Sequence, residues 1–401
     1  MSNRQYGFSK IWWSTALLVF GVSCASSPPK PTFEQRTVGL YVQGSELYKQ
    51  HEYVQAIYLL KQAVGFNPEF REAYYFLGLC YTEIQDYKKA VLMLKKSSEF
   101  AAVTTKPGFS EADIEYRLGI VYSLSKQTEL AEKAFKKALL LKSDFADALY
   151  QLAFLSMEKG MDIKAKEYLT AVVDADSTFD RAFFSLGMLS IDEGDSLGAE
   201  RNFLTAIRLN NNNKSAYNKL GELFFGKGQF DKALRYFRRA LQLDSKFDDA
   251  KVNLGLTYIE TKEYDAASDI FRALINTDSL NAGNYFYLGN VYTIIGDTSQ
   301  ALLNFKKSIA IDSSVCEVNF EIGLIEEAHG DFSDALASYR SELRLNPKQL
   351  DCRFNLAVLL HRMGRFRTAL DEYRKFISFV SAEDKRAIRV KSILEELDEL
   401  N

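Results

Sequence analysis

A single interval of 34 residues recurs along most of this chain. A small residue stands at positions 119, 153, 187, 221, 255, 289, 323 and 357, so that each step is 34 residues. Twelve residues after each comes an alanine, from Ala131 to Ala369, and four residues further a large side chain, from Phe135 to Tyr373. Segments around residues 44 and 78 obey the same offsets. Such a period predicts stacked copies of one structural unit in place of separate globular domains.

Each copy is expected to be a pair of helices. Apolar residues recur within it at spacings of three and four, which is typical of two amphipathic helices. Only six prolines occur in 401 residues, and Pro28, Pro29 and Pro31 stand together near the start. Because proline lacks an N–H and clashes with the preceding helical turn, its scarcity favours long helical stretches. The small residue of the first helix and the alanine of the second are expected to let the two backbones approach closely, with the large residue beside them.

These residues resemble the tetratricopeptide repeat (TPR) family over residues 37–381, in ten copies. Leu118-Gly119-x-x-Tyr122 and Leu254-Gly255-x-x-Tyr258 show the pattern most clearly. The resemblance implies an all-α fold, a right-handed α-solenoid of about ten helix pairs. The sequence further predicts a C-terminal capping helix over residues 382–401, because solenoids need a terminal cap with a polar outer face. The glycines predicted to have a structural role at the close approach are Gly78, Gly119, Gly187, Gly221, Gly255, Gly289 and Gly323.

One interval breaks the period. The step from Gly78 to Gly119 is 41 residues, so seven residues are inserted near residues 100–111. The run Thr104-Thr105-Lys106-Pro107-Gly108 predicts a loop. Such an insertion is either a contact loop or a neutral addition that the stack tolerates, and the sequence leaves both open.

The first 23 residues are predicted to be a secretory signal peptide. Residues 1–10 carry two positive charges and no acid, residues 11–22 are mostly apolar, and small residues follow. Twelve residues rise only about 18 Å as a helix, which is too short to span a bilayer core of about 30 Å. The run Gly21-Val22-Ser23-Cys24 resembles the lipobox of bacterial lipoproteins. That resemblance implies a lipid on Cys24, and an ordinary signal peptide with an incidental cysteine is the alternative.

A Ser/Pro-rich segment, residues 24–36, is predicted to be a tether, because such composition favours extended chain. In bacterial lipoproteins an aspartate after the lipidated cysteine retains the product at the inner membrane. Ala25 stands there in this chain, so the resemblance implies the outer membrane, at its periplasmic face or at the cell surface.

No constellation for catalysis, cofactors or metals is found in the sequence. It has three histidines, far apart, and lacks the motifs of metalloproteases, P-loops and serine hydrolases. Cys80, Cys316 and Cys352 are predicted to be small buried thiols on first helices. A net charge of −3 excludes a strongly basic nucleic-acid binder. We therefore expect no enzyme, no cofactor and no metal.

The TPR resemblance implies that the first helices line a concave groove. We number the residues of each repeat so that the small residue is position 8. Position 5 is then mostly aromatic. Aromatic side chains there could pack in the core or bind a partner, and packing is the simpler interpretation. Position 9, usually asparagine in the family, is mostly apolar here, with Ser45, Glu222 and Asn290 as polar exceptions. An apolar row on a soluble protein often marks a binding surface. The predicted partner-binding groove residues are Tyr75, Leu79, Tyr116, Ile120, Tyr150, Phe154, Phe184, Met188, Leu256, Phe286, Phe320, Leu324, Phe354 and Val358.

The sequence thus predicts a membrane-tethered scaffold of the bacterial cell envelope. Its partners would be envelope proteins or peptides held by apolar anchors in the groove, with the membrane contacted through the N-terminal lipid. An extracytoplasmic carrier of a small ligand, or a surface adhesin, is the alternative.

Overall fold

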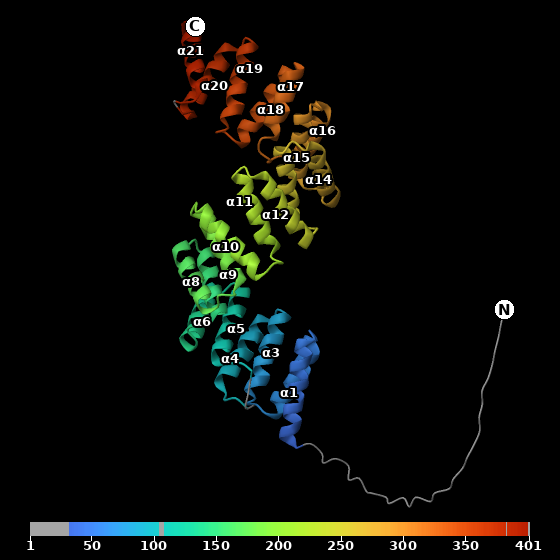
Figure 1. Ribbon diagram of the computed structural model, residues 1–401, viewed down its shortest axis with the longest axis vertical. Helices are drawn as coiled ribbons and strands as arrows, with labels where there is room; N and C mark the ends of the chain where they lie inside the picture. Colours follow the sequence, from blue (N-terminus) through green and yellow to red (C-terminus); the bar gives the residue numbers. More distant parts are fainter. Residues whose placement is uncertain (1–31, 104–107, 382, 400–401) are drawn as a thin grey trace, which may run out of the picture. The chain divides into compact units, whose positions relative to one another are not determined.

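The computed structural model describes residues 32–103, 108–381 and 383–399 (Figure 1). Over these residues the chain forms twenty-one α-helices, and no strand occurs among them. Consecutive helices pack in pairs, which confirms the all-α solenoid. The signal segment, Cys24 and most of the tether lie outside the described residues. None of the helices described is both long and apolar enough to cross a membrane.

The chain divides into two compact units, residues 1–148 and 149–401, each built from the same helix pairs. The boundary falls inside helix α7 (Ala146–Glu158). The helices of the first unit are α1 (Phe33–Lys49), α2 (Tyr53–Phe66), α3 (Arg71–Glu83), α4 (Tyr87–Glu99), α5 (Glu111–Leu124) and α6 (Thr128–Leu141).

The second unit continues the same alternation of first and second helices. Its helices after α7 are α8 (Asp162–Ala175), α9 (Asp180–Asp192), α10 (Ser196–Leu209), α11 (Lys214–Gly226), α12 (Phe230–Leu243), α13 (Asp248–Glu260), α14 (Tyr264–Thr277), α15 (Ala282–Ile295), α16 (Thr298–Ile311), α17 (Val318–His329), α18 (Phe332–Leu345), α19 (Leu350–Arg362), α20 (Phe366–Phe379) and α21 (Lys385–Glu399).

A glycine on the first helix lets most pairs close, and Ala153 and Ala357 take its place in two of them. A β-carbon added to Gly255 would lie 2.7 Å from Cζ of Phe271, a ring that is completely buried. Contacts this short do not occur between real side chains, so the position requires glycine or a local shift. The two helices therefore lie close together at this glycine. An equally short contact with a ring recurs at Gly119, Gly187, Gly221, Gly289 and Gly323, and with the side chain of Leu94 at Gly78.

The turn inside each pair needs one residue with positive φ. It lies seven positions after the small residue, and glycine occupies it in many copies, as at Gly228 with φ +67°. Other copies place a non-glycine residue there, namely His51, Gln85, Lys126 and Lys262, with φ between 59° and 65°. L-residues are strained in this left-handed region, because the β-carbon crowds the following carbonyl.

Most turns between pairs contain an Asx motif; those after α4 and α6, where Phe100 and Lys142 follow the helix, do not. The residue after the second helix is extended, and its side chain accepts the N–H two residues on. For example, Oδ1 of Asp244 accepts from the N–H of Lys246 at 2.9 Å. Asn67, Asp176, Asn210, Asp278 and Asp312 repeat this arrangement. Short polar residues at these places therefore stabilise the turn that connects one helix pair to the next.

Three boundaries differ from the sequence expectations. Helix α1 begins at Phe33, four residues before the expected repeat start, because Thr32 and Gln35 form a capping box. Helix α21 begins at Lys385, where Asp384 accepts the N–H of Arg386. Cys316 is exposed and precedes α17, so the prediction of a buried thiol on a first helix is wrong for it; Cys80 and Cys352 are buried.

Candidate functional site

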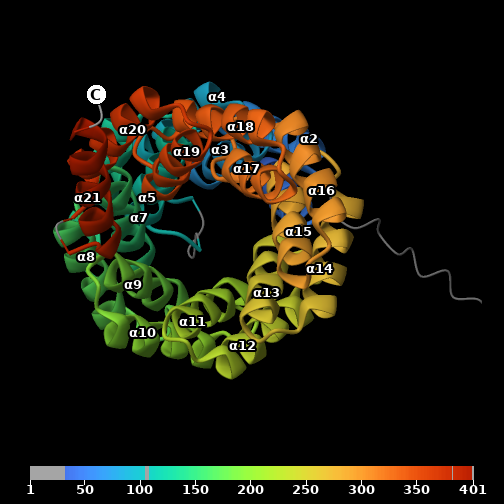
Figure 2. The same ribbon diagram turned by 90° about the horizontal axis from the view of Figure 1, so that it is seen from above.

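The first helices of the second unit line the inner side of its curve, and the second helices lie outside them. Figure 2 shows α11, α13 and α15 inside α12, α14 and α16. Helix α11 contacts α13, and α13 contacts α15, so neighbouring first helices approach each other directly. Side chains that project from these helices toward the inside of the curve therefore share one surface, which we call the inner face.

A hollow of about 660 Å³ lies on the inner face of the second unit. Helices α9, α11, α13 and α15 supply most of its lining. Its volume falls in the range of small-ligand or side-chain pockets. The residues that line it are Phe184, Ser215, Asn218, Lys219, Glu222, Phe247, Asp249, Val252, Asn253, Asn281, Gly283, Asn284 and Tyr287.

A hydrogen-bonded network centred on Glu222 stands in this hollow. Oε1 of Glu222 accepts from Nδ2 of Asn218 at 2.6 Å and from Nδ2 of Asn253 at 3.2 Å. Nδ2 of Asn253 also lies 3.2 Å from Oδ1 of Asn218. The other carboxylate oxygen pairs with Nζ of Lys219 at 2.7 Å. The network joins α11 to α13; Asn218 is 3% exposed and Asn253 is half-buried, so Asn253 is the amide that is more open to the hollow.

Amide side chains of this kind suit a polypeptide ligand. An amide carries two donor hydrogens and one acceptor oxygen, which can pair with the C=O and N–H groups of an extended main chain. The network engages Nδ2 of Asn253 and both polar atoms of Asn218, so Oδ1 of Asn253 is the amide atom that lies outside it. Phe184 and Tyr287 add aromatic surface at the edges of the same hollow. The arrangement is therefore suited to main-chain hydrogen bonds with side-chain contacts beside them.

Among the predicted groove residues, Phe184 is the one that lines the hollow. The other aromatic residues of position 5 are half-buried or buried, and they pack against rings of the core. The ring centroids of such pairs lie 5.2 to 6.0 Å apart in Tyr116–Phe135, Tyr150–Phe179, Phe184–Phe203, Phe286–Phe305, Phe320–Tyr339 and Phe354–Phe376. Packing is thus a structural role that these rings have in the solenoid.

The apolar row at position 9 is not uniform. Phe154 is 47% exposed, whereas Leu79 is only 7% exposed and belongs to the core of the first unit. Ile120, Met188, Leu256, Leu324 and Val358 are half-buried. Phe154 is therefore the member of the row that is most open to a partner.

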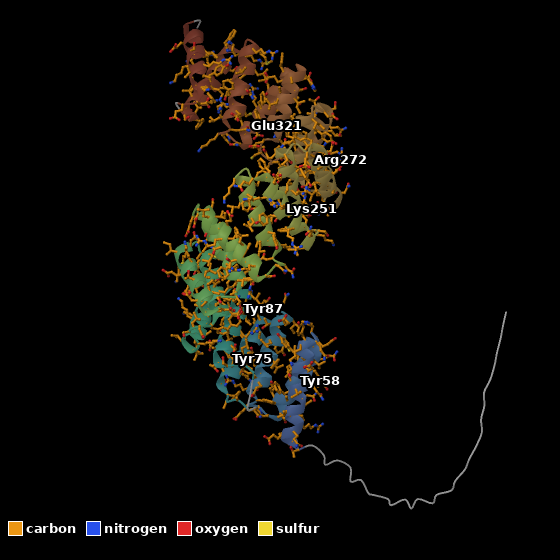
Figure 3. All side chains as sticks on the ribbon, in the orientation of Figure 1. Tyr58, Tyr75, Tyr87, Lys251, Arg272 and Glu321 are labelled. Atoms are coloured by element: carbon orange, nitrogen blue, oxygen red, sulfur yellow. The ribbon has the colours of Figure 1, made fainter. Side chains whose placement is uncertain are left out.

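In the first unit, the flanks of the insertion cover part of α3. The ring of Phe109 stacks on that of Tyr75, with centroids 3.8 Å apart and planes 10° apart; Tyr75 is labelled in Figure 3. The N–H of Val103 donates to Oε2 of Glu72, which is fully buried, and Nη2 of Arg71 pairs with Oε2 of Glu111 at 2.9 Å. Tyr75, a predicted groove residue, is therefore covered by the protein's own chain.

The buried cysteines are not activated. Burial raises the pKa of both Cys80 and Cys352 to about 12, so both remain thiols at neutral pH. Since the thiolate is the reactive form, neither is a candidate nucleophile. In the part of the chain that the structure describes, no cluster of three or more histidine, cysteine or acidic residues has the geometry of a metal site.

The paired helices and the 34-residue period define a repeat protein of the α-solenoid class. Models of the tetratricopeptide repeat match residues 47–103, 112–145, 184–246, 224–285 and 320–383. Together these matches cover more than half of the chain, which belongs to the TPR family. Proteins of this family generally mediate protein–protein interactions. A comparison with curated protein sequences gave no match.

Solved structures of TPR proteins resemble this chain at low identity. Yeast Tom70 is 14% identical, with a TM-score of 0.48 over 92% of this chain and 96% of its own. PilF of Pseudomonas aeruginosa is 22% identical, with a TM-score of 0.46 over 52% of this chain and 92% of its own. YrrB, described as a TPR protein with an unusual peptide-binding site, is 22% identical, with a TM-score of 0.37 over 47% of this chain and 97% of its own.

Proposed function

We propose that this protein is a membrane-tethered interaction scaffold of the bacterial cell envelope, which binds polypeptide partners on its inner face. The observation that carries the binding part is the Glu222 network, because it places polar groups, with Asn253 the more open amide, in a hollow large enough for several side chains. Asp249 lines the same hollow, so a partner segment with a basic residue beside its main-chain contacts fits best.

The tether part rests on the N-terminal sequence. Cys24 follows a short apolar segment, and the Ser/Pro-rich residues between it and α1 would hold the first unit about 20–30 Å from a membrane if extended. Ala25 after the cysteine supports the outer membrane as the destination.

Metabolic labelling with an alkyne fatty acid tests the tether. The wild-type chain should incorporate label and sediment with outer membranes, whereas Cys24→Ser should do neither. Equal labelling of both chains would contradict lipidation at Cys24.

Partner capture tests the inner face. Asn218→Ala with Asn253→Ala removes two amides of the network, and it should reduce capture of envelope polypeptides without loss of helicity. Asn211→Ala with Asn212→Ala, at exposed positions before α11, is the matched control. Identical capture by both pairs would refute binding at this hollow.

A carrier or adhesin is the second candidate, because exposed apolar groups such as Phe154 also suit a small hydrophobic ligand or a host protein. Proteolysis of intact cells separates the two. Repeats cleaved without permeabilisation favour the adhesin, and protected repeats favour the periplasmic scaffold.

A further inference from the structure

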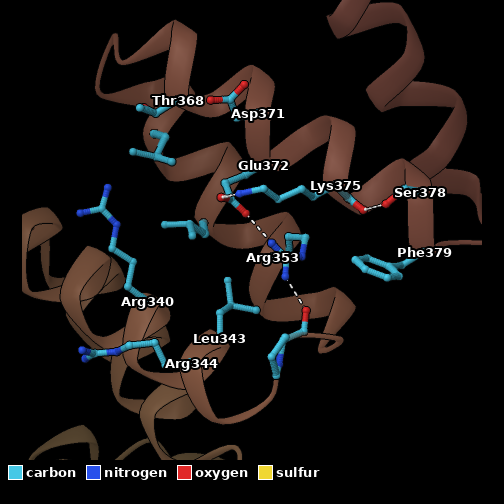
Figure 4. Close-up of a pocket in the computed structure, with 13 residues that line it drawn as sticks. Arg340, Leu343, Arg344, Arg353, Thr368, Asp371, Glu372, Lys375, Ser378 and Phe379 are labelled. Carbon is cyan, nitrogen blue, oxygen red and sulfur yellow. Dashed lines mark hydrogen bonds and ion pairs between the residues drawn. The ribbon is translucent and has the colours of Figure 1, made fainter.

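A second cavity of the second unit lies on the side opposite to the inner face. It has a volume of about 840 Å³ and lies between the second helices α18 and α20, with α19 beneath it (Figure 4). Its lining includes four cations, Arg340, Arg344, Arg353 and Lys375, and two carboxylates, Asp371 and Glu372. We call it the basic cavity.

Arg353 forms the centre of the basic cavity and is only 7% exposed. Its Nη1 pairs with Oε2 of Glu372 at 2.6 Å, and its Nη2 donates to the carbonyl oxygen of Pro347 (Figure 4). Its buried Nε has no hydrogen-bond partner among the described residues. Buried donors are nearly always paired in proteins, so this guanidinium keeps part of its hydrogen-bonding capacity unused.

The carboxylates do not balance the cations. Glu372 forms ion pairs with two cations, Arg353 and Lys375, since its Oε1 also lies 2.7 Å from Nζ of Lys375. Arg344 donates to the neutral hydroxyl of Ser341 at 2.9 Å, and Arg340 and Arg344 are both exposed. A recess with a surplus of positive charge attracts anions, and its low-dielectric walls strengthen the attraction.

The repeat itself does not require these charges. One period earlier, Asn319 replaces Arg353, Ser338 replaces Glu372 and Ser341 replaces Lys375. The helix pairs close there with the same glycine contact, at Gly289 and Gly323. Another repeat also buries a charge at this position, since Glu115 is 5% exposed and pairs with Lys137 at 2.5 Å. The feature that sets the basic cavity apart is therefore its surplus of cations, since four cations face two carboxylates.

We propose that the basic cavity binds an acidic segment of a partner polypeptide. A carboxylate of that segment would lie against the exposed guanidinium groups of Arg340 and Arg344, with the positive charge of Arg353 close by. Leu343 and Phe379, which also line the cavity, would receive an apolar side chain next to the acid. Arginine matches this task, because its planar fork holds carboxylates through paired hydrogen bonds. The site is independent of the hollow on the inner face.

Fluorescence anisotropy on the full chain in detergent tests the proposal. The probe is a short fluorescein-labelled peptide of glutamate and leucine. The charge reversal Arg340→Glu with Arg344→Glu should weaken its binding about tenfold or more, which is about 1.4 kcal/mol or more. Arg365→Glu with Arg367→Glu makes the same change in net charge at exposed residues outside the cavity, and should leave binding within about twofold.

Two further arms make the result decisive. The Arg340→Ala, Arg344→Ala pair should weaken binding as well, and unchanged circular dichroism should show that each variant is folded. Asn218→Ala with Asn253→Ala on the inner face should have no effect, so that failure here is distinct from failure of the inner-face proposal. Equal binding by both charge-reversal pairs, equal binding of a peptide with glutamine for glutamate, or full displacement by inorganic phosphate would overturn the proposal.

Discussion

Gly221 of α11 and Phe237 of α12 are packed so closely that a β-carbon on the glycine would lie 2.4 Å from Cε1 of the ring. Phe237 is 1% exposed, so the ring has little space into which to move. Gly221→Ala should therefore destabilise the second unit by about 1–3 kcal/mol, even though alanine favours helix by about 0.5–1 kcal/mol. Denaturant unfolding followed by circular dichroism measures the change.

Gly39→Ala is the control for this substitution. Gly39 lies inside α1, and a β-carbon there would meet nothing within 4 Å. Alanine should stabilise α1 by about 0.5–1 kcal/mol. If both glycines tolerate alanine equally well, the close contact does not define the repeat.

Lys262 and Gly228 occupy the same turn position in neighbouring repeats, with φ of 63° and 67°. Lys262→Gly should stabilise the protein by about 1 kcal/mol, because glycine is not strained in this region. Gly228→Lys should destabilise it by a similar amount. Melting curves of the two variants should shift in opposite directions, and shifts of the same sign would argue against the strain.

Glu342 is fully buried on α18, where Oε1 accepts the N–H of Glu317 at 2.9 Å. Burial, followed by the nearby charge of Glu317, raises the pKa of Glu342. A carboxyl with a raised folded pKa binds its proton more tightly in the folded state. This contribution to stability is present below the unfolded pKa of about 4.3, and it is lost as pH rises through the folded value.

Glu342→Gln keeps an acceptor and removes that titration. The variant should be more stable than the wild type at pH 7, and the difference should shrink as pH falls toward 4. Urea unfolding at several pH values checks this. A difference that is constant with pH would show that the carboxyl does not titrate as its burial predicts.

Phe154 and Leu79 share position 9 of their repeats but differ in exposure, 47% against 7%. Phe154→Ser should change stability by less than about 0.5 kcal/mol and reduce partner capture. Leu79→Ser should cost about 2–5 kcal/mol, because it introduces a cavity and a polar group into the core. Undiminished capture by Phe154→Ser would remove this residue from the binding surface.

Much of the fold follows from the 34-residue period, because a small residue and a large apolar side chain sixteen positions later specify how each helix pair closes. The same period explains the turn at Gly228 and its strained counterpart at Lys262. It gives no equivalent rule for Cys316, which stays outside α17 because Glu317 takes φ +72° and the helix begins after it.

The candidate site was less predictable. Asn218 and Glu222 are visible in the sequence as polar exceptions at positions 5 and 9. On their own they indicate only that two otherwise apolar rows are interrupted. Their meaning comes from Asn253, which lies on the next first helix and joins the network across the pair of repeats. Such a contact depends on the rotation of one repeat against its neighbour, and the spacing of residues does not specify that rotation.

Photocrosslinking from the inner face tests the central claim most directly. A benzoylphenylalanine at Tyr287, which lines the hollow, should crosslink discrete envelope polypeptides in cells, and Asn218→Ala with Asn253→Ala should abolish those products. The same probe at Leu197, which is 73% exposed on α10, should not give them. Identical products from both positions, or products from Tyr287 that survive loss of the two asparagines, would contradict a partner-binding inner face.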